Sequence, residues 1–364
     1  MADWDFILAP ATVAVDIVLD EVAIISNSVK MLSAKEFHSG LHDWVGNTAY
    51  DMSTERRETN HKLAMFIDQF TVEVNAKTFP EFIAGIADLS PSVVTDIALT
   101  WLRHVDNYPG DEIVSRDLSA YMDVARAFHN MKQSKGHDKE FDAAEWQEEW
   151  EMLQEPQQIL EMAVEHLTFL WDNYLESEWQ RVKPMMIEAV DAFNQVDYSE
   201  MTAYDAIEAV AGRNMRGKDF FEERLEKADR LVFMPNAHLG PYISWGGTKD
   251  DKTMVFFFGA RPPKNAKVKS AALSRSELLV RLNALADETR LKILEMLTER
   301  DELCAQDFIT GLDLSQSSAS RHLRQLTASG YLNERRRDVA KCYSINPERI
   351  DDTIQALKIF LKKD

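Results

Sequence analysis

Cysteine and long apolar runs are scarce in this sequence of 364 residues. No run of 18 apolar residues occurs, and residues 1–5 bring no basic segment ahead of an apolar one. We therefore expect neither a membrane span nor a secretion signal, and we predict a cytoplasmic protein with no membrane partner. Cys304 and Cys342 are the only cysteines, and in such a protein they are more often plain thiols than a redox switch.

Motifs of the common enzyme classes are also absent. The sequence has no glycine-rich phosphate loop, no nucleophile elbow and no paired-histidine protease motif. Gly246-Gly247 lacks the lysine and helix of a phosphate loop, so it indicates a hairpin turn. His38 and His42 have a spacing that suits a metal on one helix turn, but Gly40 between them fits a loop entering a helix. We expect no enzyme, no metal and no cofactor.

The apolar pattern changes from helical to β along the chain, and the length predicts two or three domains. Residues 11–225 are mostly helical in pattern, although Val and Ile in residues 14–32 leave that segment open to a strand. The predicted helices are residues 55–74, 91–105, 117–131, 142–152, 156–183 and 220–228, and Pro184 would start or kink a helix reaching 194. Strand patterns occupy residues 230–235, 242–245 and 253–259, with residues 5–8 as a further candidate.

The content of charged residues and proline changes near residue 260, which predicts a domain boundary there. Residues 261–270 contain two prolines and alternating lysines, the composition of a linker. We predict an N-terminal domain of residues 1–260, a linker of residues 261–272 and a C-terminal domain of residues 273–364. Residues 273–364 hold 15 basic and 15 acidic side chains, whereas residues 1–272 hold 26 and 46. The N-terminal domain therefore carries the whole net charge of −20.

Residues 315–330 predict a helix with two unlike faces. Ser315 can cap its start and Gly330 can close its end in the left-handed conformation. Ala319, Leu323 and Leu326 recur at helical spacing and would be buried. The opposite face carries hydroxyl, amide and guanidinium groups and no carboxylate: Gln316, Ser317, Ser320, Arg321, Arg324 and Gln325. Such a face suits contact with base edges and phosphates better than contact with water alone.

The neighbouring segments complete a larger motif. Residues 303–310 form a short apolar helix pattern, and residues 311–314 supply a turn before the helix at 315. Residues 331–335 and 341–345 read as a hairpin whose basic side chains are Arg335, Arg336, Arg337 and Lys341. Helix, turn, helix and basic hairpin are the layout of a winged helix-turn-helix. The predicted fold is therefore mainly α: a large helical N-terminal domain with a small β sheet, and a C-terminal winged helix-turn-helix.

Three blocks of residues 276–346 resemble the ArsR family of bacterial winged-helix regulators. The blocks are residues 285–294, residues 315–323 and Gly330-Tyr-Leu, in the order and spacing of that family. The resemblance implies a homodimer that binds operator DNA, usually as a repressor, and that pairs through the first and last helices of the domain. Apolar stripes on those two helices support such an interface: Leu278 and Leu282 on the first, and Ile350, Ile354, Leu357 and Leu361 on the last.

The metal ligands of the best-known family members are not all present. Cys304 matches the first of two cysteines in the helix before the turn, but Gln306 stands where the second should be. Asp351 and Asp352 match an alternative site on the last helix, yet no histidine follows Arg349. Soft metals need several thiolates or imidazoles, so we do not expect metal sensing.

We predict the following roles. Gln316, Ser317, Ser320 and Arg321 contact base edges, because they lie toward the start of the helix. Arg324 and Gln325 reach phosphates, and the basic hairpin holds the backbone or enters the minor groove. The N-terminal domain receives a signal that is not a metal, and its helix-borne tryptophans at 101, 146, 150, 171 and 179 could line a cavity for a small apolar ligand.

Two alternatives of other classes remain. The N-terminal domain could be an enzyme tethered to a DNA-binding head, which a deep polar pocket with converging histidine or carboxylate side chains would favour. The winged helix could instead serve protein–protein assembly, which the carboxylate-free face disfavours.

Overall fold

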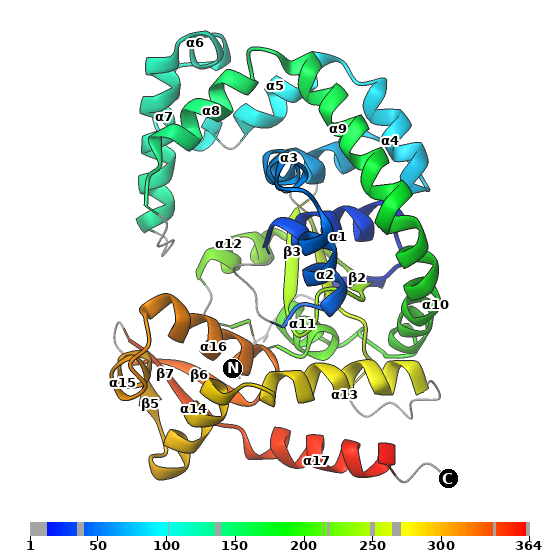
Figure 1. The fold of residues 1–364 in the computed structure, drawn as a ribbon, viewed down its shortest axis with the longest axis vertical. Coiled ribbons are helices and arrows are strands. Elements are labelled where there is room, and N and C mark those ends of the chain that lie inside the picture. Colours follow the sequence, from blue (N-terminus) through cyan, green and yellow to red (C-terminus); the bar gives the residue numbers. More distant parts are fainter. Residues whose placement is uncertain are drawn as a thin grey trace, which may run out of the picture. The chain divides into compact units, whose positions relative to one another are not determined.

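The computed structural model describes residues 13–34, 40–100, 102–134, 140–213, 215–216, 219–247, 252–263, 271–337 and 340–361. It divides into two compact units. The first, which we call the sheet–wing unit, comprises Met1–Leu19, Ala34–Asn47 and Arg181–Asp364. The second, the helical unit, comprises Asp20–Ser33 and Thr48–Gln180. The predicted fold class, mainly α with small sheets, is confirmed (Figure 1). The predicted boundary at residues 261–272 stays a prediction.

The helical unit is built from helices in the first half of the chain. Their bounds are α1 (Glu21–Ala34), α2 (Asp43–Asp51), α3 (Thr54–Glu73), α4 (Phe79–Ala87), α5 (Pro91–Thr100), η1 (Leu102–His104), α6 (Asp111–Arg116), α7 (Leu118–Ser134), α8 (Ala143–Met152) and α9 (Pro156–Leu170). Ser53 caps α3, and Thr78 with Glu81 forms a capping box on α4. Helix α9 packs against α3, α4 and α5 (Figure 1). The helices predicted from periodicity are therefore present, whereas α2, α4 and α6 were not predicted.

A buried polar pair lies inside this helical core. His166 on α9 is fully buried, and its Nε2 lies 3.0 Å from Oδ1 of Asn60 on α3. The Asn60 amide nitrogen donates in turn to the carbonyl of Val29, at 3.0 Å. Burial, more than the nearby Arg56 guanidinium, lowers the pKa of His166 to about 4. The imidazole is therefore neutral at pH 7 and acts as part of the core.

The helical run from α9 onward continues across Pro184 and covers the two segments that were predicted. A π-helical turn, η2 (Trp171–Leu175), connects α9 to α10 (Glu176–Phe193). Pro184 lies inside α10, so it neither starts a new helix there nor ends one. Two further helices, α11 (Ala203–Ala211) and α12 (Asp219–Lys227), precede the strands.

A four-stranded sheet lies in the sheet–wing unit. Its order is β1 (Ala14–Ile17), β2 (Arg230–Asn236), β4 (Thr253–Gly259) and β3 (Ile243–Gly247), with β1, β2 and β4 parallel and β3 antiparallel. Phe193 and the apolar side chains of α11 pack against Phe233 and Phe256 of the sheet. The first strand occupies part of the segment that we expected to begin a helix, because Val13 and Ile17 are buried in this core. The candidate strand at residues 5–8 lies outside the described residues.

The C-terminal part has the predicted winged helix-turn-helix order. Its elements are α13 (Ala271–Leu285), α14 (Glu288–Glu299), β5 (Leu303–Cys304), α15 (Ala305–Gly311), α16 (Gln316–Ala328), β6 (Leu332–Arg337), β7 (Ala340–Ile345) and α17 (Pro347–Leu361). The three strands form a sheet of order β5–β7–β6. Its core is built by Ile293, Phe308, Leu323, Leu326 and Tyr331, all buried. Helices α13 and α17 contact each other along one side (Figure 1).

Across the described ranges, no single helix combines the length and apolar character needed to cross a membrane. One bent pair, Phe79–Ala87 with Pro91–His104, passes that test by length and composition only.

Candidate nucleic-acid interface

Helix α16 is fixed at both ends by its own sequence. The hydroxyl of Ser315 accepts a hydrogen bond from the Ser318 amide at 3.2 Å, which caps the start of the helix. Gly330 follows the helix with φ of +82°, a conformation that disfavours other residues. A side chain there would also lie 3.1 Å from Nε of Arg349. Ala319, Leu323 and Leu326 are buried as predicted.

The opposite face of α16 is exposed to solvent. Its exposed members are Gln316, Ser317, Ser320, Arg321 and Arg324. The hydroxyls of Ser315 and Ser317 lie 3.1 Å apart at the N-terminal end. The exposed side chains on this face thus supply donors, acceptors and two positive charges, and none of them is a carboxylate. We call these five residues the reading face.

Gln325 does not belong to the reading face, so its predicted contact with phosphate is wrong. Its side chain is 2% exposed, and its Oε1 accepts a hydrogen bond from Nη1 of Arg290 at 2.6 Å. The Arg290 guanidinium, itself 5% exposed, also donates to the carbonyls of Ala284 and Asn283 at 2.6 and 2.8 Å. These bonds hold α16 against α14 and the end of α13. A helical wheel could not separate the edge of the reading face from this buried contact.

His322 supports α16 from the inside of the domain. It is 9% exposed, and its Nδ1 lies 3.5 Å from Oδ1 of Asp287. Burial lowers its pKa and the Asp287 carboxylate opposes that effect. Asp287 also caps α14 by accepting from the Arg290 amide. An acidic residue at a helix start is recognisable from the sequence, but the contact of Asp287 with α16 is not.

The wing is a basic hairpin of β6 and β7, as predicted. Arg335, Arg336, Arg337 and Lys341 are all exposed. Arg335 forms a two-pronged ion pair with Glu302, and Nη1 of Arg337 lies 3.8 Å from the same carboxylate. The Arg335 guanidinium lowers the pKa of Glu302, which therefore stays ionised. One carboxylate is shared by two guanidinium groups, so this part of the wing keeps a positive charge.

Cys304 and Cys342 form a disulfide, so the expectation of two plain thiols is wrong. The two residues stand directly opposite each other in the antiparallel pair of β5 and β7. The bond links residues 38 positions apart and fastens the wing to the strand ahead of α15. Nη2 of Arg337 lies 3.5 Å from the Cys304 sulfur. Sequence spacing alone could not place these two residues on neighbouring strands.

Only part of the predicted dimer stripe is available at the surface. Ile354 and Leu361 are 48% and 71% exposed, and Leu282 and Leu357 are partly exposed. Leu278 is 5% exposed and Ile350 packs against the winged-helix core, so these two serve the fold of the monomer instead. Three unpredicted side chains add to the exposed apolar surface of α13 and α17: Leu279, Ile359 and Phe360.

Comparison with known proteins identifies this region. The model of the family described as "Bacterial regulatory protein, arsR family" matches residues 287–334. The arsenical resistance operon repressor of Escherichia coli (strain K12) is 48% identical over 63 residues, which are 17% of this chain and 54% of the relative. The transcriptional activator HlyU of Vibrio cholerae serotype O1 is 34% identical over 82 residues, 22% of this chain and 75% of the relative. The chain belongs to the arsR family.

The cadmium resistance transcriptional regulatory protein CadC homolog of Staphylococcus aureus is also similar, with 35% identity over 21% of this chain and 63% of the relative. The chain spans about half the length of the first curated arsenic-resistance relatives that it matches, 54% and 50%. The matched region of this arsR-family chain is its winged helix. The helical unit lies outside every one of these matches.

The residues present do not fit the metals that some of these names mention. The Cys304 sulfur is bonded to Cys342 and is not a thiolate. Gln306 offers an amide in place of a second thiol, and α17 carries Asp351 and Asp352 without a histidine. Within the described ranges, no group of three or more His, Cys, Asp or Glu side chains is arranged to hold a metal ion. His42 instead accepts a hydrogen bond from the Trp44 amide at 3.1 Å, and His38 lies outside the described residues.

Proposed function

We propose that this arsR-family protein is a sequence-specific, DNA-binding transcriptional regulator that acts in the cytoplasm as a repressor. The reading face supports this function most directly, because it exposes hydrogen-bonding and cationic side chains and excludes carboxylates. Gln316, Ser317, Ser320 and Arg321 contact base edges in the major groove, since they lie in the first half of α16. Arg324, further along, reaches a phosphate.

The wing contributes affinity more than sequence preference. Arg335, Arg336, Arg337 and Lys341 contact the DNA backbone or enter the minor groove beside the reading face. Glu302 orients Arg335 before DNA arrives. The acidic excess of residues 1–272 repels DNA, so the same charges hold the rest of the chain away from the duplex. We therefore expect binding that weakens steeply with salt.

Titration of the full-length protein onto its own promoter DNA tests this assignment. Arg321→Ala should cost about 1–3 kcal/mol on the operator and relax sequence preference. Arg336→Ala should weaken binding to all sequences by a similar factor. Lys292→Ala is the matched control, because it removes an exposed cation on α14, outside the reading face and the wing. An Arg321→Ala titration that overlays the unsubstituted protein would show that the face is assigned wrongly.

The proposed regulator is a homodimer that pairs through α13 and α17. The exposed apolar surface of α13 and α17 supports this, because such patches mark interaction surfaces on soluble domains. Its members are Leu282, Ile354, Leu361, Ile359 and Phe360. Ile359→Asp should shift the mass measured by light scattering toward the monomer. Leu291→Asp, at a 52% exposed leucine on α14, should not.

Residues 1–260 receive the signal in this proposal, and the signal is a small molecule other than a metal. A winged helix without its family's metal ligands still needs an input, and the upstream residues are the part of the chain that can receive one.

A further inference from the structure

The helical unit contains a cavity of about 250 Å³ between α3, α5, α7 and α8. Much of its wall is apolar: Ala64, Met65, Phe66, Ala98, Met152 and Leu153. Phe66 and Leu153 are 1% and 6% exposed, so the floor is part of the core, whereas Met65 is 38% exposed. A cavity of this size with apolar walls can accommodate a small organic molecule.

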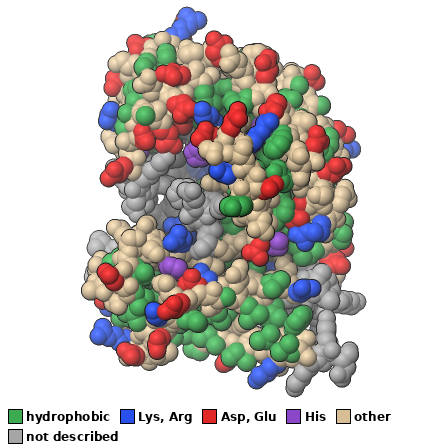
Figure 2. All heavy atoms as spheres, viewed as in Figure 1, with side chains coloured by type: hydrophobic (Ala, Val, Ile, Leu, Met, Phe, Trp, Pro, Cys, Tyr) green, Lys and Arg blue, Asp and Glu red, His purple; other side chains and the backbone are tan. Residues whose placement is uncertain are grey.

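The polar lining of the cavity is mainly acidic. Glu145, Glu148 and Glu149 line it from α8, and His61 and Lys62 line it from α3. Lys62 forms an ion pair with Glu148. Acidic side chains also gather on the surface over α7 and α8, toward the upper left of Figure 2. The electrostatic field in the cavity therefore favours a cation over an anion.

Tyr121 on α7 connects the apolar and acidic parts of the lining. Its side chain is 2% exposed, and its hydroxyl donates to Oε2 of Glu149 at 3.4 Å. Burial and the Glu149 charge both raise the pKa of Tyr121, so the phenol stays neutral. Tyr121 lines the cavity, and its aromatic ring can contact a cationic guest through a cation–π interaction.

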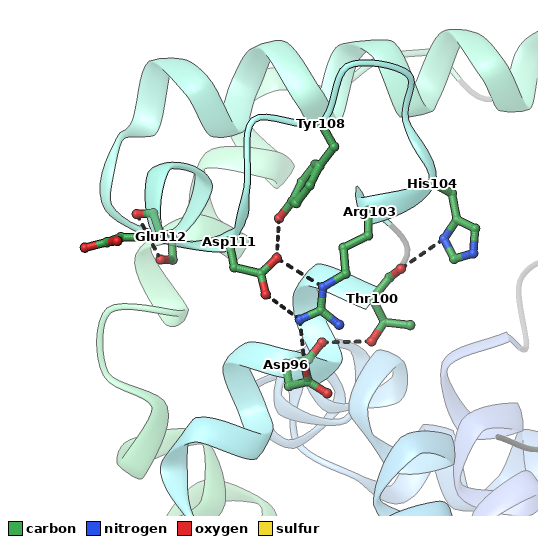
Figure 3. A network of polar contacts seen from close by, with 8 residues as sticks. Asp96, Thr100, Arg103, His104, Tyr108, Asp111 and Glu112 are labelled. Atoms are coloured by element: carbon green, nitrogen blue, oxygen red, sulfur yellow. Dashed lines mark hydrogen bonds and ion pairs between the residues drawn. The ribbon is translucent and has the colours of Figure 1, made fainter.

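The walls around the cavity are held by contacts that do not involve its interior. The ring centroids of Trp146 and Tyr121 lie 6.3 Å apart, and Trp146 meets Phe128 edge-on at the same distance. At the end of α5, Arg103 bridges Asp96 and Asp111, and the Tyr108 hydroxyl donates to Asp111 at 3.0 Å (Figure 3). Helix α5 therefore ends at a turn that these ion pairs and this hydrogen bond hold together.

We propose that this cavity binds a small organic cation with an apolar body, such as a quaternary or protonated amine. The hydrocarbon part fills the space between Phe66, Ala98 and Met152, and the positive centre faces the carboxylates of α8. Such a cation is the signal that regulates DNA binding, and this regulatory role rests on the function proposed above. Binding itself follows from the cavity and its charge.

Calorimetry on the full-length protein with an isosteric pair of probes tests the binding. Benzyltrimethylammonium should bind, whereas neopentylbenzene, its neutral carbon isostere, should bind at least tenfold more weakly, and phenylacetate should not bind. Equal affinity for the cation and its neutral isostere would overturn the proposal, and so would no heat from either. Tryptophan fluorescence provides a second readout, because Trp146 contacts Tyr121 of the lining.

Substitutions locate the site. Glu149→Gln keeps a hydrogen-bond acceptor for Tyr121 and removes one charge, so it should weaken the cation at least fivefold and leave neopentylbenzene unchanged. Glu151→Gln is the matched control, because Glu151 is exposed on the same helix and does not line the cavity. Ala64→Leu should reduce binding of both probes by filling the space, with thermal unfolding as the check on folding. If Glu151→Gln weakened cation binding as much as Glu149→Gln, the proposed location of the site would be wrong.

The cation site and the DNA-binding function can be refuted independently of each other. If benzyltrimethylammonium binds but leaves promoter affinity unchanged, the cation site stands and its regulatory role is refuted. If the protein binds its promoter but not the cation, the site is refuted and the DNA-binding function stands.

Discussion

The winged helix and the helical unit show two ways in which a sequence encodes function. In the winged helix, the functional residues are neighbours in the sequence: the reading face spans Gln316 to Arg324 on one helix. In the helical unit, the candidate site draws on α3, α5, α7 and α8, from His61 to Leu153. A short motif is therefore enough to recognise the first, and only packing assembles the second.

Unfolding of the two regions can also be followed by different measurements. All eight tryptophans lie before residue 246 and both cysteines lie after residue 303. Tryptophan fluorescence thus follows unfolding upstream of the winged helix, and DNA binding or hydrogen exchange follows the winged helix itself.

Arg290→Leu should have the largest effect, about 3–5 kcal/mol of destabilisation in the winged helix. It leaves two carbonyls and the Gln325 amide oxygen without their buried donor. Hydrogen exchange of α14 and α16 measures the loss, and the tryptophan-detected transition should move much less. A cost below 1 kcal/mol would mean that these bonds do not hold α16 in place.

Reduction of the Cys304–Cys342 disulfide should lower the stability of the winged helix by about 2–4 kcal/mol. The helical unit contains no cysteine, so its tryptophan transition should stay where it is. Denaturant titrations with and without reductant, repeated with Cys342→Ser, measure both. A reductant effect that persists in Cys342→Ser would be unrelated to this bond.

Acid should affect the helical unit through His166. Its folded pKa of about 4 lies below the ordinary value of 6.5, so the unfolded chain binds more protons between these pH values. The stability from the neutral buried imidazole is complete above pH 6.5 and declines by about 3 kcal/mol as pH falls to 4. His166→Gln should flatten this dependence in tryptophan-detected unfolding at pH 7 and pH 4.5. If the free energy of unfolding depends on pH as steeply in His166→Gln as in the unsubstituted protein, other groups cause the acid sensitivity.

Helix caps should give the smallest effects, with one informative contrast. Ser53→Ala and Ser315→Ala each remove a side-chain bond to a first-turn amide, so each should cost about 1 kcal/mol. Only Ser315→Ala should also weaken DNA binding, because it frays the end of α16 that carries the reading face. If Ser53→Ala weakened DNA binding as much as Ser315→Ala, the cap of α16 would have no special role in DNA binding.

The sequence predicted the winged helix closely, because its helix and strand patterns are short-range. Capping, burial of Ala319, Leu323 and Leu326, and the basic hairpin all follow from neighbouring residues. The errors concern contacts across the fold: Gln325 lies at the edge of the predicted face, and Arg290, 35 positions away, decides that it is buried. Leu278 fits an outward stripe by spacing, yet it packs inside the monomer.

Upstream, periodicity located the long helices and the short α12 but missed α2, α4, α6 and α11, and residues 14–17 became a strand. That strand forms because β2, whose Arg230 pairs with Ala14, offers a parallel edge. Local propensity contains no information about such a partner. The tryptophans were expected to line a cavity, but Trp146 supports a wall and does not line the space.

By itself, the sequence determined the family, the helix order of the winged domain and the presence of Gln306 two positions after Cys304, because these depend on residues close together in the chain. The tertiary structure decided which polar side chains are exposed, that two cysteines 38 positions apart form a bond, and that three glutamates of α8 line an apolar cavity. The physical reason is that burial and charge environment are set by the whole fold, whereas capping and periodicity are set within a few turns of helix.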